Sequence, residues 1–138
     1  MGFITRARIV GNVTVSGGAA QNFFTSTLNG MLESIIYQKA TVSGFSTAGH
    51  MTITAAQSGY TLLSVTTTGT SGVAVSYWPR AAQEDTSHGA LSYASGVTPP
   101  FIPTQFPIAQ EAIKVVMTSG GAASAGGLGF TIDFYLSQ

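Results

Sequence analysis

The C-terminal stretch "LGFTIDFYLSQ", residues 128–138, decides the fold class. Every second side chain in it is apolar: Leu128, Phe130, Ile132, Phe134 and Leu136. Successive side chains of a β-strand point to opposite faces, so this alternation predicts a strand with one face in a hydrophobic core.

Several other segments show strand patterns. In "RARIVGNVTVSGG", residues 6–18, one face is apolar, and we predict a strand over 6–15 with Gly11 marking a bulge. "HMTITAA" alternates in the same way, "QSGY" supplies a turn, and "TLLSVTTT" and "GVAVSYW" are rich in β-branched residues. "TGTSG" between the last two predicts a hairpin connection, and a second hairpin is expected between 112–118 and 128–136.

Two segments are harder to assign. In "NFFTSTLNGMLESIIYQKA", residues 22–40, apolar side chains four apart fit a helix, but a glycine inside a helix costs about 1 kcal/mol. We therefore predict a strand over Gly30–Lys39, preceded by a short strand containing Phe23 and Phe24. "GVTPPFIPTQFPIAQ" holds four of the chain's five prolines, which remove backbone donors, so it predicts an extended segment crossing between sheets.

Together these patterns predict an all-β fold. We expect an antiparallel β-sandwich or jelly roll of about seven to eight short strands. Residues 1–5 are expected to form an N-terminal arm that orders only in an assembly, followed by a single domain over 6–138. Within this arm, Gly2, Phe3 and Ile4 precede the alternating pattern and are candidate interface residues.

Charge is scarce in this chain. Only 7% of its 138 residues are charged and the formal net charge is zero, whereas ordinary soluble domains carry about 25% charged residues. A nucleic-acid partner needs a basic patch, and no apolar run is long enough to span a membrane, so neither partner is expected. Low net charge favours association, which suits a subunit of an assembly and predicts a homo-oligomer.

A polar loop stands out against this background. Arg80, Glu84, Asp85 and His88 lie within nine positions, next to Trp78, the chain's only tryptophan. We interpret the segment from Arg80 to His88 as a contact loop, because charge pairs at an interface specify register. Its anchors on the sandwich are predicted to be three residues: Trp78, Pro79 and Tyr93.

Catalytic and metal sites are weaker readings of the same loop. Ser87, His88 and Asp85 are too close in sequence for a hydrolase triad, and no "GxSxG" motif is present. Glu84, Asp85 and His88 lack the spacing of a calcium loop. We expect no enzyme activity, no cofactor and no metal; His50 is interpreted as a turn residue, and Glu33 and Asp133 as solvent-facing.

Several short motifs of the chain also resemble those of a known protein family. The aromatic-Pro-Arg turn at Trp78, Pro79 and Arg80, followed by Asp85, Gly89 and Tyr93, resembles small β-rich virion structural proteins of tailed phages. A Pro-Ile-Ala step at 107–109 and a glycine-rich segment before the last strand extend the similarity over residues 6–136. The basic residue that follows the glutamate in that family is replaced here by Ala112, after Glu111.

The resemblance implies a virion structural role in capsid decoration or cementing. The implied partners are the major capsid protein or other virion subunits, and the chain would be made in the host cytoplasm, since its N-terminus lacks a signal-peptide pattern. The alternative is a carbohydrate-binding, host-adhesion module, in which Trp78, Tyr77 and Tyr93 would form a sugar-stacking platform.

Overall fold

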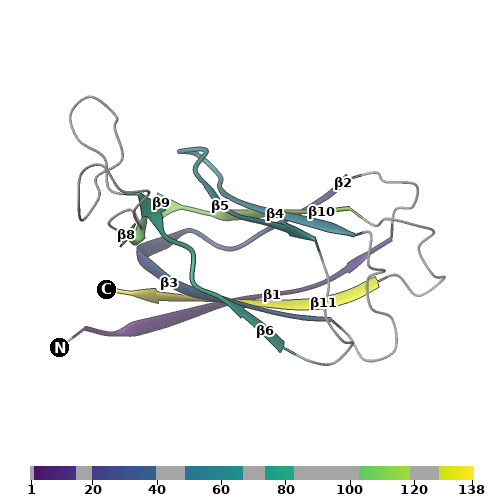
Figure 1. Cartoon of the computed structure of the whole chain (residues 1–138), viewed down its shortest axis with the longest axis horizontal. Coiled ribbons are helices and arrows are strands. Elements are labelled where there is room, and N and C mark those ends of the chain that lie inside the picture. The colour runs from purple at the N-terminus through teal and green to yellow at the C-terminus, as the bar shows by residue number, and fades with distance from the viewer. Residues whose placement is uncertain (1, 15–19, 40–48, 67–73, 83–102, 119–127) are drawn as a thin grey trace, which may run out of the picture.

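The computed structural model describes residues 2–14, 20–39, 49–66, 74–82, 103–118 and 128–138. These residues contain strands and no helix, so the predicted all-β class is confirmed. The strands form two antiparallel sheets that lie one above the other, with the two chain ends at the same end of the lower sheet (Figure 1). This is a β-sandwich.

One sheet has five strands, arranged in the order β1-β11-β3-β6, with β9 also paired to β3. Its strands are β1 (Ile4–Val13), β3 (Leu28–Lys39), β6 (Ala74–Tyr77), β9 (Phe106–Glu111) and β11 (Leu128–Ser137). The second sheet has the order β2-β10-β4-β5. It is formed by β2 (Ala20–Phe24), β4 (His50–Ala55), β5 (Thr61–Thr66) and β10 (Ile113–Thr118).

A two-stranded ribbon of β7 (Ala81–Ala82) and β8 (Pro103–Thr104) completes the described strands. The described chain therefore has eleven strands rather than the seven or eight expected, two of them only two residues long. The sequence places of the longer strands are confirmed: Gly30–Lys39 lies in β3, and Phe23 and Phe24 end β2.

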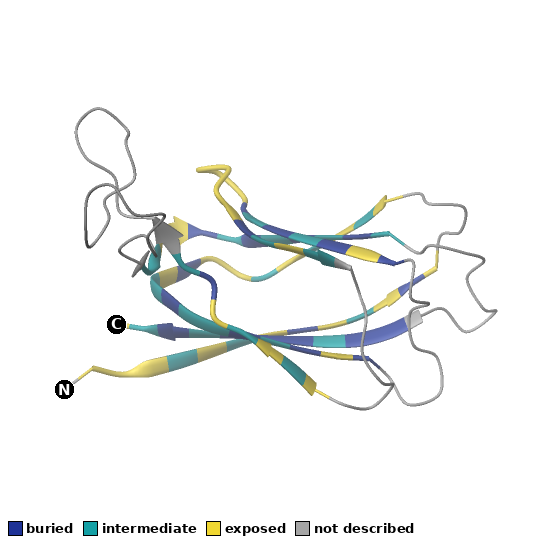
Figure 2. Ribbon diagram, viewed as in Figure 1, coloured by how far each residue is buried: buried dark blue, intermediate teal, exposed yellow. Residues whose placement is uncertain are grey.

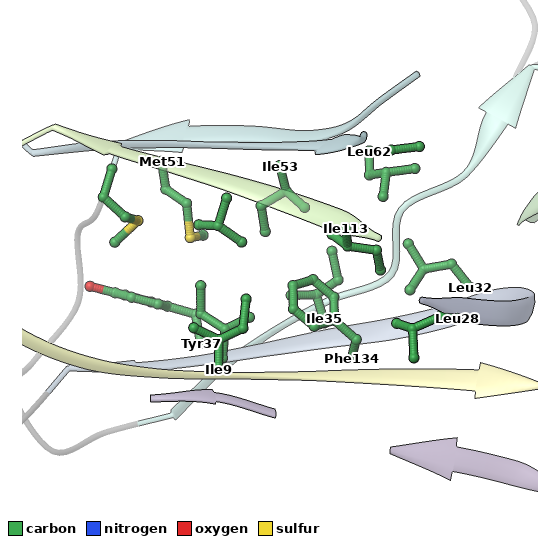
Figure 3. Packing of buried hydrophobic residues seen from close by; sticks show 14 of the residues in the cluster. Ile9, Leu28, Leu32, Ile35, Tyr37, Met51, Ile53, Leu62, Ile113 and Phe134 are labelled. Atoms are coloured by element: carbon green, nitrogen blue, oxygen red, sulfur yellow. The ribbon is translucent and has the colours of Figure 1, made fainter. Parts of the chain in front are cut away.

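The hydrophobic core fills the space between the two sheets (Figures 2 and 3). The second sheet contributes Met51, Ile53, Leu62, Ile113, Val115 and Met117, and the five-stranded sheet contributes Ile9, Val13, Leu32, Ile35, Tyr37, Phe130, Ile132, Phe134 and Leu136. Burial raises the pKa of the Tyr37 phenol, which keeps it neutral in this apolar layer. The alternating residues that predicted the strands are therefore the residues that hold the sheets together.

Both predicted hairpins are wrong. β10 pairs with β2 and β4 in one sheet, whereas β11 pairs with β1 and β3 in the other. In the same way β5 pairs with β4, and β6 pairs with β3. A strand buries one face against the opposite sheet whichever sheet it joins, so the alternating pattern did not decide between a hairpin and a change of sheet.

The proline-rich crossing is only partly described, because residues 83–102 lie outside the described residues. The chain changes sheets at Ala112, directly after this segment: β9 pairs with β3, and β10 belongs to the second sheet. The Ala112 carbonyl accepts a hydrogen bond from the Ala56 amide at 2.9 Å, so the crossing is tied to the turn between β4 and β5.

Gly11 does not mark a bulge. The register between β1 and β11 runs without a shift from Ile4 and Ser137 to Val13 and Leu128. A Cβ atom at Gly11 would instead lie 2.8 Å from ring carbons of both Phe23 and Phe130. These two rings meet edge to face with centroids 4.9 Å apart, so glycine is needed at this position to make room for the aromatic pair.

The predicted N-terminal arm, residues 1–5, overlaps β1. Ile4 and Thr5 belong to β1 and pair with Ser137 and Leu136, and the Phe3 carbonyl accepts a hydrogen bond from the Gln138 amide at 2.9 Å. Strand pairing therefore orders these residues within the chain itself, because β11 continues far enough to reach them. The prediction of a single domain over 6–138 stays a prediction.

Candidate interaction surfaces

The outer face of the five-stranded sheet, turned away from the core, carries a bidentate ion pair between its first two strands. Arg8 on β1 donates from Nε to Oδ1 of Asp133 at 2.7 Å and from Nη2 to Oδ2 at 2.8 Å. These hydrogen bonds hold the pKa of the Asp133 carboxyl below its usual range. Asp133 was predicted to face solvent, but only 8% of it is exposed, because the Arg8 side chain covers it.

At the opposite edge of this sheet, formed by β6 and β9, Arg80 contacts β3. β9 pairs with the first part of β3 and β6 with the last part, and Glu33 lies between them at a shift in the β3–β11 register. Arg80 donates to the Glu33 carbonyl at 3.0 Å, and its Nη2 lies 3.8 Å from Glu33 Oε2. This predicted interface residue therefore ties the end of β6 to β3, and only 28% of its side chain is exposed.

The predicted anchors of the polar loop differ from each other. Pro79 is buried, whereas 66% of Trp78 is exposed, so the large loss of stability expected if Trp78 were buried does not apply, and its anchoring role stays a prediction. β6 is a short strand at the edge of its sheet, and Trp78 directly follows its last residue. Glu84, Asp85, His88 and Tyr93 lie outside the described residues, so the contact loop itself stays a prediction.

The third described acidic residue, Glu111, makes hydrogen bonds within the chain. Its carboxylate accepts hydrogen bonds from the amides of Gln57 and Ser58 at 2.8 and 2.9 Å and from the Ser58 hydroxyl at 2.8 Å. These donors lower the pKa of Glu111. The carboxylate thereby fixes the turn between β4 and β5, and no pair of free opposed carboxylates, as a glycosidase needs, remains among the described residues.

Exposed apolar side chains gather along β1. Six large apolar side chains are exposed in the described chain, and three of them are Phe3 at 73%, Ile4 at 69% and Val10 at 72%. Phe3 and Ile4 were expected at an interface; Val10 was not. The signal for it was present, because Val10 is an apolar residue on the strand face that otherwise carries Arg6, Arg8 and Asn12.

His50, interpreted as a turn residue at the start of a strand, is the first residue of β4, and its Nε2 lies 3.1 Å from Ser64 Oγ on β5. Within the described parts of the chain, no three histidine, aspartate or glutamate side chains come together as metal ligands. No helix in those parts could cross a membrane.

Comparisons with known proteins give little beyond this geometry. No family model and no curated protein matches the chain. Among solved structures, a chain of infectious bursal disease virus Gx strain matches with a TM-score of 0.38 and 11% identity, over 99% of this chain and 31% of that one. A chain of the Gt strain matches with a TM-score of 0.37 and 12% identity, over 98% of this chain and 32% of that one. This chain spans about a third of the length of either viral chain.

Proposed function

We propose that this chain is a structural protein of a phage particle that adheres to the capsid shell as a decoration or cement protein. The observation that carries the proposal is that three of the six exposed large apolar side chains of the described residues, Phe3, Ile4 and Val10, lie in β1 or directly before it. Singly exposed apolar residues are ordinary, but several exposed along one edge strand favour a protein-binding surface. The similarity of residues 6–136 to tailed-phage virion proteins supports the same role.

The distribution of charge supports it as well. The three described carboxylates are each engaged within the chain, with Arg8, with Arg80 and with the turn at Gln57 and Ser58. A surface with few free charges makes contacts that depend little on salt, because little of the attraction is Coulombic. Many weakly held subunits on one shell can bind tightly together through effective concentration.

On this proposal the chain is not an enzyme and needs no cofactor. It is made in the host cytoplasm and then resides in the virion, with the major capsid protein or another virion subunit as its partner. Assembly as a homo-oligomer belongs to the same proposal.

The test is binding to particles assembled without the protein, measured by sedimentation at low and high sodium chloride. We expect binding to survive high salt, and a Phe3→Ser, Ile4→Ser double variant to bind at least about tenfold more weakly, a loss of about 1.4 kcal/mol per contact. Phe24→Ser is the matched control, because Phe24 is 57% exposed but lies on β2 in the other sheet. Equal binding by the double variant and the control would refute the proposal.

A carbohydrate-binding, host-adhesion role is the second candidate, and the exposure of Trp78 favours it. An indole ring open to solvent can stack on a sugar ring, which a buried one cannot. Trp78 is the chain's only tryptophan, so quenching of its fluorescence on a glycan array reports on this side chain alone. Quenching that Trp78→Phe abolishes would favour this candidate; we expect none.

A further inference from the structure

Some backbone amide and carbonyl groups of β1 make no hydrogen bond to another described strand. The Gln138 amide donates to the Phe3 carbonyl, and the register pairs each following residue of β1 with the preceding residue of β11. In an antiparallel ladder the residues of a strand alternate between facing their partner and facing away. The backbone groups directed away from β11 are therefore those of Ile4, Arg6, Arg8, Val10 and Asn12.

One end of this margin is already covered. The Gln21 side chain accepts a hydrogen bond from the Thr14 amide at 3.0 Å and donates to the Asn12 carbonyl at 3.3 Å. The Gln21 side chain therefore satisfies two backbone groups of this edge that a neighbouring strand would otherwise bond. Its own strand, β2, contacts β1. β1 is the last strand in its sheet. Its residues 4–10 have no neighbouring strand among the described residues on the side away from β11. We call these residues the open edge.

The side chains beside the open edge have a defined pattern. Ile4 and Val10 are apolar and exposed at its two ends, and two arginines lie between them. Arg8 already makes two hydrogen bonds to Asp133. Arg6 makes no ion pair within 4 Å among the described residues, so it is the cation left for a partner.

We propose that the open edge binds an extended segment of a partner protein as an additional antiparallel strand. That segment places a carboxylate opposite Arg6 and apolar side chains opposite Ile4 and Val10. Backbone hydrogen bonds would supply affinity, and the alternate side chains would supply specificity, as in other cases of strand addition. The inference rests on the backbone geometry and the side chains of the open edge, and it does not require the partner to be a virion subunit.

A second copy of this chain is the wrong occupant by charge. Two β1 strands related by a two-fold axis can pair centrally with Arg6 opposite Arg6, with Arg6 opposite Arg8, or with Arg8 opposite Arg8. Like charges directly opposite each other destabilise a sheet. A carboxylate at the same place would form the favourable cross-strand pair, so complementary charge selects an acidic partner strand.

The test uses the whole chain and two seven-residue peptides with blocked ends, VTSTETV and VTSTKTV. In the antiparallel register that sets the first valine opposite Val10, the glutamate or lysine lies opposite Arg6. NMR titration with amide hydrogen exchange is expected to show slower exchange at Ile4, Arg6, Arg8 and Val10 with the glutamate peptide. The lysine peptide should bind at least about tenfold more weakly.

Two variants separate the proposal from general stickiness. Arg6→Glu should reverse the preference between the peptides. Val10→Pro removes an outward amide without breaking a bond to β11, so it should abolish binding of either peptide while leaving the far-ultraviolet spectrum unchanged. Val10→Thr keeps the amide and loses only the apolar contact with the peptide valine, so it should bind more weakly than the unchanged protein but still bind the glutamate peptide.

Equal binding of both peptides, no binding of either, or protection of other amides would overturn the proposal. A dimer in sedimentation equilibrium that Val10→Pro dissociates would also overturn it, because the open edge would then belong to a second copy. None of these measurements involves particles, so failure here is distinct from failure of the proposed virion role.

Discussion

The two margins of the five-stranded sheet differ in how they are finished. One is a single strand of ten residues, β1, paired with β11 without a register shift. The other consists of two shorter strands, β6 and β9, with Pro107 in β9 and a bulge at Gln110, whose φ is 53°. Short strands, prolines and bulges protect a sheet margin from pairing with another chain.

The difference shows where the fold uses its few polar groups. At the β6 and β9 margin, Arg80 is directed to the Glu33 carbonyl, and the Gln110 amide donates to Asn29 Oδ1 at 2.8 Å. At the β1 margin, Gln21 covers one end and the rest stays open. One margin is interrupted by short strands, a proline and a bulge, and the other is one continuous strand, to which we propose a partner binds.

The largest loss of stability is expected for a substitution in β11, because this strand lies between β1 and β3 and so joins the two edges of the sheet. Phe134 is fully buried between the sheets on this central strand. Phe134→Ala removes most of a packed ring and leaves a cavity, so unfolding in denaturant should show a loss of about 3–5 kcal/mol. A loss below about 1 kcal/mol would mean that the two sheets do not share one core at this point.

A smaller effect is expected from the ion pair beside the open edge. Asp133→Asn weakens two charge-assisted hydrogen bonds, and the free energy of unfolding should fall by about 2 kcal/mol at neutral pH. The pKa of Asp133 is lowered in the folded chain, so its contribution is present above the ordinary aspartate pKa of about 3.9 and is lost as pH falls through the lowered value.

Arg6 and Arg8 provide the matched control for this pair. Arg8→Met should raise the pH at which acid unfolds the protein, because Asp133 then loses the donors that keep it ionised. Arg6→Met should shift the acid transition much less, because Arg6 lowers the pKa of Asp133 through its charge alone and donates no hydrogen bond to it. An equal shift in both variants would show that total charge, rather than the bidentate geometry, stabilises the sheet.

The smallest effect is expected at the β6 and β9 margin. Arg80→Met removes hydrogen bonds to the Glu33 and Pro79 carbonyls and should cost about 1 kcal/mol in thermal or denaturant unfolding. Trp78→Ala should change stability by less than about 0.5 kcal/mol, because the indole is exposed. A larger cost for Trp78 than for Arg80 would contradict this account of the margin.

The sequence predicted the strands well and their partners poorly. Period-two alternation in 128–136 and 51–55 marks which face of each strand is expected to be buried, and that face is buried in the structure over 130–136 and 51–55. The same pattern does not predict which strands pair with each other, because a strand buries one face in either sheet. The two predicted hairpins therefore failed although their strands were correct.

The interaction surfaces were only partly predictable. Phe3 and Ile4 were predicted as interface residues, and their side chains are exposed, but the pairing with β11 that orders them depends on residues more than a hundred positions away. The tie between Arg80 and Glu33 likewise joins positions that no local pattern connects. Val10 could have been recognised as an apolar residue out of phase with its strand.

The most direct test of the contrast between the margins is native-state hydrogen exchange along β1 in the free protein. Amides that face β11, those of Thr5, Ala7 and Ile9, should exchange slowly, and those of Ile4, Arg6, Arg8 and Val10 should exchange near the rate of an unprotected amide. Slow exchange at all seven positions in the monomer would contradict the account, because it would show that the edge is already covered within the chain.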